Sequence, residues 1–236
     1  CMLENLNGML DDYIPHFIKL VLEEMNNKEI TKGYVQKLLE CIFCCLYYNP
    51  KLTFMHLEQQ NAIKSMTEAL FGNLRQFKET SAMSSVIYGT STMLKLNLSD
   101  IPEEIKVTLE GIISNLVDLM ERFIKAKERE EVEEESEEED SDDELPGITK
   151  HEEKLKKGKN KDLDEYDSDP DDLYDDEYLF SGSELDLYYG PFDQKFAPLY
   201  FKETIQNNND LIQLVPVEKQ STLEDIFRRC EVLQNS

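Results

Sequence analysis

Apolar residues recur at helical spacing in five successive segments of the chain, at residues 14–25, 35–46, 63–77, 83–94 and 105–124. Each segment gathers its apolar side chains on one helix face, and such a face needs a neighbouring element to cover it. The second segment is expected to end before Pro50, because proline breaks a helix interior. Gly89, inside the fourth segment, is expected to mark a close approach between two helices. The pattern predicts an all-α fold.

The spacing of these segments indicates a repeat. If the helices pair as hairpins, the first members begin near residues 12, 60 and 102, which gives a period of roughly 42–48 residues, close to that of HEAT and armadillo-like repeats. An ordinary four- or five-helix bundle would show similar segments and stays open as an alternative. The spacing favours the C-terminal end of a helical-repeat solenoid. Because a helical pattern is already under way at residues 2–6, we expect further sequence upstream.

A long polar stretch interrupts the helical pattern. Residues 128–190 hold few apolar residues and are expected to form a disordered acidic loop, with a lysine-rich island at 150–161. Helical patterns return afterwards, and a last helix is expected to start either at a capping box over residues 221–224 or at Pro216. The predicted domains are therefore HEAT-like repeats over 1–127, the insert over 128–190, and a helical segment over 191–236 that packs on the last repeat.

The charge of the chain is concentrated in this insert. The formal net charge is −25, and two runs account for most of it, since residues 128–144 hold thirteen Asp or Glu against one Arg and residues 164–177 hold nine and no base. Dense negative charge repels nucleic-acid phosphates and anionic lipid, so direct binding to nucleic acid is disfavoured. The natural partners are basic proteins, although solubility alone would also explain the runs. No apolar run is long enough for a membrane span.

The two acidic runs supply the candidate site residues. We expect basic cargo to bind their carboxylates, namely Glu133, Glu134, Glu135, Glu137, Glu138, Glu139, Asp140, Asp142, Asp143, Glu144, Asp169, Asp171, Asp172, Asp175, Asp176 and Glu177. Four serines in the same segment have an acid three residues on and are candidate phosphorylation sites: Ser136, Ser141, Ser168 and Ser183. Each phosphate would add about −1.5 to −2 charges to the segment.

We find no motif for catalysis or metal binding in the sequence. Cys41, Cys44 and Cys45 fall within one apolar helix pattern, without the second ligand pair of a zinc site or the strand–helix context of a redox motif, so core packing is favoured. His16, His56 and His151 stand apart from one another. The chain contains no P-loop, Rossmann glycine pattern or nucleophile elbow. We expect a non-enzyme with no catalytic residue, cofactor or metal, from a reducing compartment.

Several stretches resemble a known family in the same order along the chain. They are Ser84 to Leu96 with the motif Ser-Ser-Val-Ile-Tyr-Gly-Thr, Ile101-Pro102, the helix ending at Phe123-Ile124-Lys125, the acidic stretch directly after it, Tyr189-Gly190-Pro191-Phe192-Asp193, residues 200–207, and the helix containing Leu223-Glu224-Asp225-Ile226. Together they resemble the C-terminal part of the importin-7/importin-8 branch of the importin-β (karyopherin-β) family.

The resemblance implies a nuclear transport receptor that shuttles between nucleus and cytoplasm through the nuclear pore. It implies binding to the Ran GTPase through N-terminal repeats that this chain lacks, contacts with nucleoporins, and import of basic cargo such as histones or ribosomal proteins. The rival interpretation is a helical-repeat scaffold whose acidic segment acts as a chaperone for histones or ribosomal proteins without transport.

Overall fold

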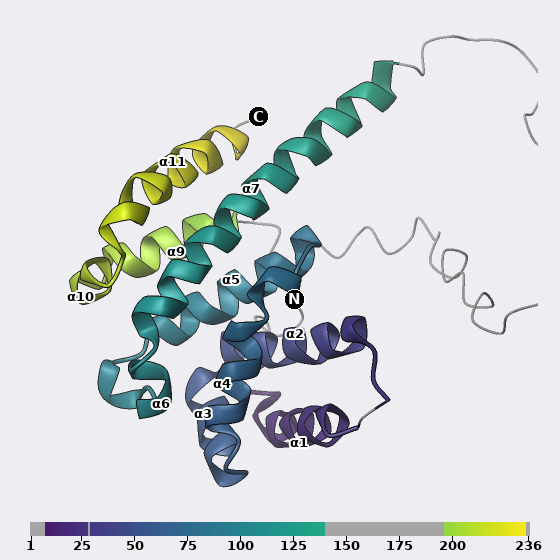
Figure 1. The fold of residues 1–236 in the computed structure, drawn as a ribbon, viewed down its shortest axis with the longest axis vertical. Helices are drawn as coiled ribbons and strands as arrows, with labels where there is room; N and C mark the ends of the chain where they lie inside the picture. The colour runs from purple at the N-terminus through teal and green to yellow at the C-terminus, as the bar shows by residue number, and fades with distance from the viewer. Residues whose placement is uncertain (1–7, 28, 140–195, 235–236) are drawn as a thin grey trace, which may run out of the picture. The chain divides into compact units, whose positions relative to one another are not determined.

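The computed structural model describes residues 8–27, 29–139 and 196–234. Within these ranges every regular element is helical, so the predicted all-α class is confirmed, and the structure is consistent with a helical-repeat solenoid. The helices, labelled in Figure 1, are α1 (Ile14–Met25), α2 (Lys32–Tyr48), α3 (Pro50–Gln59), α4 (Ile63–Gly72), α5 (Thr80–Leu94), α6 (Glu103–Lys106), α7 (Leu109–Glu139), α9 (Ala197–Gln206), α10 (Asn209–Gln213) and α11 (Val217–Leu233).

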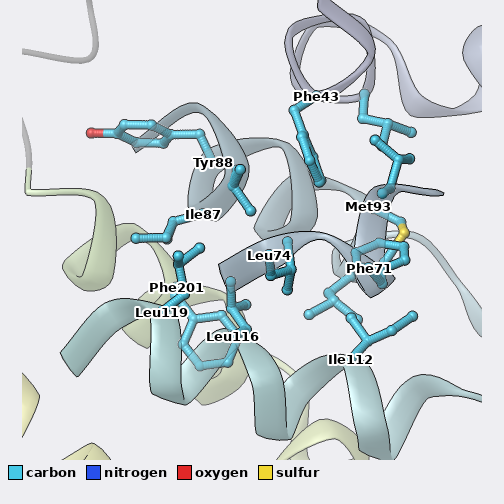
Figure 2. Packing of buried hydrophobic residues seen from close by; sticks show 14 of the residues in the cluster. Phe43, Phe71, Leu74, Ile87, Tyr88, Met93, Ile112, Leu116, Leu119 and Phe201 are labelled. Carbon is cyan, nitrogen blue, oxygen red and sulfur yellow. The ribbon is translucent and has the colours of Figure 1, made fainter. Parts of the chain in front are cut away.

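The described residues up to Glu130 and those from Phe196 onward belong to one compact unit. Helix α2 packs along α5, α5 also packs against α9, and α1 packs against α2 and α3. Figure 2 shows side chains from α2, α4, α5, α7 and α9 in a single apolar cluster. Segments on both sides of the acidic stretch therefore share one hydrophobic core.

Gly89 of α5 lies where α5 approaches α2 most closely. A Cβ atom at this position would lie 3.0 Å from the carbonyl carbon of Phe43 and 3.1 Å from its Cα, and closer still to its carbonyl oxygen. Both residues are interior to their helices, and Phe43 is fully buried. The close approach expected at Gly89 is confirmed, and it depends on the absence of a side chain.

Helix α3 did not appear among the predicted segments. Pro50, which we expected to end the preceding helix, also occupies the first turn of α3, where a missing N–H costs nothing. Asn49 caps this helix, because its side-chain oxygen accepts a hydrogen bond from the Leu52 amide at 3.1 Å. Phe54 and Leu57 bury the inner face. An Asn-Pro pair before an apolar i, i+3 spacing was the available sequence signal.

Other helices begin or end at residues that differ from the bounds of the predicted segments, because local turns set where each helix stops. The segment predicted over 63–77 leaves the helix at Gly72, and a 3-10 turn, η3 (Leu74–Gln76), carries the chain onward. The segment over 105–124 is divided between α6 and α7. The last helix begins directly after Pro216, so residues 221–224 lie inside α11 and the predicted capping box is wrong.

The end of α7 also lies beyond the predicted boundary. We expected ordered repeats to stop at residue 127, but the α7 backbone is helical through Glu139. Ion pairs along the helix offset part of the acidic repulsion, since Lys125 pairs with Glu121 at 2.6 Å and Lys127 with Glu130 at 2.8 Å. The described helix therefore extends past residue 127, where we expected the repeats to end. Residues 140–190 lie outside the described part of the chain.

Candidate functional site

The candidate site is the place where the acidic stretch leaves the folded unit. Of the predicted cargo-binding residues, Glu133, Glu134, Glu135, Glu137, Glu138 and Glu139 fall on the helical end of α7, as does the candidate phosphorylation site Ser136. The predicted residues from Asp140 to Glu177, together with Ser141, Ser168 and Ser183, lie outside the described residues. The structure thus places residues 128–139 of the first acidic run at the end of a helix.

Arg229 of α11 binds Glu128, the first residue of this acidic run. Its guanidinium donates two hydrogen bonds to the Glu128 carboxylate, at 2.8 Å and 2.5 Å, and it also lies 3.6 Å from Asp225. The hydrogen bond to Glu128 raises the pKa of Arg229 above its ordinary value. A bidentate arginine–carboxylate pair fixes geometry as well as charge. Sequence reasoning missed Arg229, because nothing local distinguishes it from any surface arginine.

A second contact holds Glu130, the last residue of α7 in the folded unit. The Thr80 hydroxyl, at the start of α5, donates to the Glu130 carboxylate at 2.9 Å. The two residues are 50 positions apart in the chain. The acidic run therefore starts from a carboxylate that a neighbouring helix orients.

The segment that follows the acidic stretch returns to the same helix. The ring of Phe196, just before α9, packs edge-on against Phe123 of α7, with centroids 6.2 Å apart. Lys219 of α11 forms an ion pair with Asp118, which precedes Phe123 on α7. Because Phe123 precedes the acidic stretch and Phe196 follows it, both ends of that stretch are attached to one folded unit.

Three tyrosines anchor α9 to the repeats. Tyr200 of α9 lies 5.2 Å from Tyr88 of α5 and 6.0 Å from Tyr47 of α2, measured between ring centroids. The Lys95 ammonium lies 3.5 Å from the centre of the Tyr200 ring, a cation–π contact, and the Tyr200 hydroxyl is 3.1 Å from that of Thr92. This cluster ties the returning chain to two earlier helices.

Part of the chain is similar in sequence to a known protein. The chain is similar to a protein described as a probable importin-7 homolog from Dictyostelium discoideum, with 26% identity over 102 residues. The match covers 42% of this chain but only about one tenth of that relative's length. This similarity supports a relationship to the importin-β family. No protein-family model matches the chain, and no solved structure matches it significantly.

A row of exposed apolar side chains lies on α1 and just before it. Phe17 and Leu20 of α1 follow Tyr13, the residue directly before the helix, at i+4 and i+7, and Met9 in the preceding turn is also exposed. Their exposed fractions range from 40% to 69%. Phe17 was expected on the covered face, which Ile14, Ile18 and Val21 occupy instead. Exposed apolar side chains that gather in this way are candidates for contact with another element.

The cysteine cluster lies in the middle of α2. Cys45 is buried, Cys41 and Cys44 are half-buried, and all three are free thiols. A hydrogen bond from the Cys45 thiol lowers the pKa of Cys41, whereas burial raises the pKa of Cys44 to about 11 and that of Cys230 in α11 to about 12. The placement fits the core-packing interpretation.

These pKa directions predict a reactivity order. With iodoacetamide near pH 8, Cys41 is expected to be alkylated first among the described cysteines, because the thiolate is the nucleophile. At pKa values near 11 and 12, Cys44 and Cys230 hold roughly a hundredth or less of the usual thiolate, and they should react that much more slowly. Timed peptide mass spectrometry measures the order. Equal rates at Cys41 and Cys44 would contradict it.

The histidines take no part in a metal cluster that the structure describes. His16 is exposed on α1, His56 lies 3.0 Å from the Gln59 side chain, and His151 lies outside the described residues. Within the described ranges no three His, Cys, Asp or Glu side chains gather so that they could hold a metal ion. None of the described helices is long and apolar enough to cross a bilayer.

Proposed function

We propose that this chain is the C-terminal part of a nuclear import receptor of the importin-7/importin-8 branch, which carries basic proteins with Ran GTPase dependence and catalyses no reaction. The observation that carries the proposal is the match to a probable importin-7 homolog by a chain that folds as a helical array. In this proposal Ran and the nucleoporins bind the receptor elsewhere, and the part described here handles cargo while the receptor shuttles between cytoplasm and nucleus.

The row of exposed apolar side chains at α1 supports the placement within a longer receptor. In a helical-repeat array each helix pair buries an apolar side against its neighbour, and a terminal pair without a cap exposes that side. Tyr13, Phe17 and Leu20 have the position and exposure of such a side. A preceding helix pair of the same polypeptide is the natural cover.

The acidic stretch supports the proposed choice of cargo. Its two runs carry net charges of −12 and −9, and the ends of the stretch are attached to one folded unit through Arg229–Glu128 and Phe123–Phe196. Because both ends are attached, many carboxylates are tethered to one folded unit, which raises their effective concentration for a partner bound to that unit. Basic cargo such as a histone or ribosomal protein would be attracted over about one Debye length, about 8 Å at physiological salt.

Neutralising the acids tests the proposal. Changing the acids of residues 133–144 and 169–177 to Gln and Asn is expected to weaken binding to a histone by at least about tenfold at physiological salt, because many weak attractions vanish together. The dependence of the affinity on salt concentration should also flatten. Titration by fluorescence anisotropy at several salt concentrations measures both effects in the full-length receptor.

An opposite change in the same stretch provides the control. Changing Lys150, Lys154, Lys156, Lys157, Lys159 and Lys161 to Gln removes positive charge and is expected to strengthen histone binding. Binding of Ran-GTP by the full-length receptor should persist in both variants. Histone affinity that is unchanged by neutralisation at both low and physiological salt would contradict the cargo role and leave the acids as a solubilising segment.

A further inference from the structure

A cleft lined by positive charge lies on this otherwise acidic chain. It has a volume of about 460 Å³ and lies between the first turn of α2 and the turn that joins α4 to α5. Its lining includes Lys32 and Gln36 from α2, and Arg75, Gln76, Lys78 and Glu79 from the turn. Neither the acidic runs nor the proposed cargo surface accounts for it.

The charge balance of the cleft is positive. Its one acid, Glu79, is already paired, because the Lys37 ammonium lies 3.1 Å from the Glu79 carboxylate. Burial opposes the charge on Lys37, but the hydrogen bonds and charges of Glu79 and Glu40 outweigh it and raise its pKa. In the part of the chain that the structure describes, Lys32, Arg75 and Lys78 form no ion pair with another residue. Three cationic side chains are therefore available to bind a ligand.

The turn that carries two of these cations is held in place from within. Arg122 of α7 donates hydrogen bonds to the backbone carbonyls of Leu74, at 3.4 Å, and Phe77. Both of those residues are buried; Leu74 directly precedes Arg75, and Phe77 directly precedes Lys78. The pKa of Arg122 is lowered by burial and by the neighbouring charge of Arg75. Positive charge is therefore concentrated on a braced turn, and little ordering is needed on binding.

We propose that this cleft binds a short acidic peptide segment of a protein partner. The volume exceeds that of a single inorganic anion and suits a few residues with carboxylate side chains. Cations from two separate elements would contact carboxylates spaced along an extended peptide. The inference does not depend on the proposed transport function.

The neighbouring acids decide between a short acidic peptide and a nucleic acid. Thr80, two residues after Lys78, bonds Glu130, so the acidic run of residues 128–144 starts close to the cleft. Repulsion from the Glu130 carboxylate grows with every charge that a ligand adds, whereas the attraction is limited to three cations. A long polyanion would also gain little from so few neutralised phosphates. A short acidic segment is the anion that this balance favours.

The experiment measures binding of a fluorescent peptide with six consecutive Glu or Asp residues to the whole chain, beside its Gln and Asn counterpart. Changing Lys32, Arg75 and Lys78 to Gln is expected to weaken binding of the acidic peptide about tenfold, the sum of three exposed ion pairs. The matched control changes Lys19, Lys64 and Arg228 to Gln, which removes the same charge from exposed sites outside the cleft, and it should change the affinity less than about twofold.

Each other outcome would overturn the inference. Equal losses in the two triple variants would show general attraction without a site. Tighter binding of a single-stranded oligonucleotide of equal charge would show the wrong class of ligand. Peptide binding that appears only after residues 140–190 are replaced by a Gly/Ser linker would show that acids of the chain itself fill the cleft. Circular dichroism melting curves confirm that all variants remain folded.

Discussion

Replacing Gly89 by alanine is expected to lower the free energy of unfolding by about 3 kcal/mol. The added methyl group would lie 3.0 Å from the carbonyl carbon of Phe43 and 3.1 Å from its Cα. These are backbone atoms of α2, so no side-chain rotation relieves the clash. Helices α2 and α5, which pack along each other, would have to separate. Urea denaturation followed by circular dichroism measures the change.

A second glycine provides the control for this experiment. A Cβ atom at Gly111, on the exposed side of α7, would meet nothing within 4 Å. Gly111→Ala should therefore raise the free energy of unfolding, by up to about 1 kcal/mol, because alanine favours the helix. Opposite signs at the two glycines are the expected result. A stabilising effect of Gly89→Ala would show that α2 and α5 do not approach as closely as described.

Replacing Arg122 by methionine is expected to cost about 2 kcal/mol, because hydrogen bonds from a charged donor to two carbonyls are lost. The carbonyls of Leu74 and Phe77 belong to buried residues and would lose this partner. Methionine keeps most of the apolar stem, so the loss reports the guanidinium rather than the packing. The stability of Arg122→Lys should lie between that of the wild type and that of Arg122→Met. Its ammonium group, on a flexible stem, does not reproduce the planar fork of the guanidinium.

Arg129, seven residues further along α7, is the matched control. It is exposed, and its replacement by methionine should change the stability by less than about 0.5 kcal/mol. The same urea denaturation experiment measures all three variants. A loss at Arg122 no larger than that at Arg129 would contradict the bracing role and would remove the support for a rigid turn at Arg75 and Lys78.

Hydrophobic periodicity by itself determined most of the helices. The segments at 14–25, 35–46 and 83–94 coincide with α1, α2 and α5, because a helix that packs on one side must repeat its apolar residues every three to four positions. Gly89 was also predictable, since a glycine within a strong helical pattern needs a packing reason. The concentration of acids in residues 128–144 and 164–177 follows from the sequence alone.

The tertiary structure decided what depends on partners far apart in the chain. Glu128 is held by Arg229, 101 residues away, and Glu130 by Thr80, 50 residues away, so no local pattern predicted that α7 would continue into the acids. The basic cleft likewise joins Lys32 to a turn more than forty residues later. Local sequence sets a helix's periodicity because that depends on neighbours within a turn or two. Where a helix ends and which charges meet depend on contacts that only folding brings together.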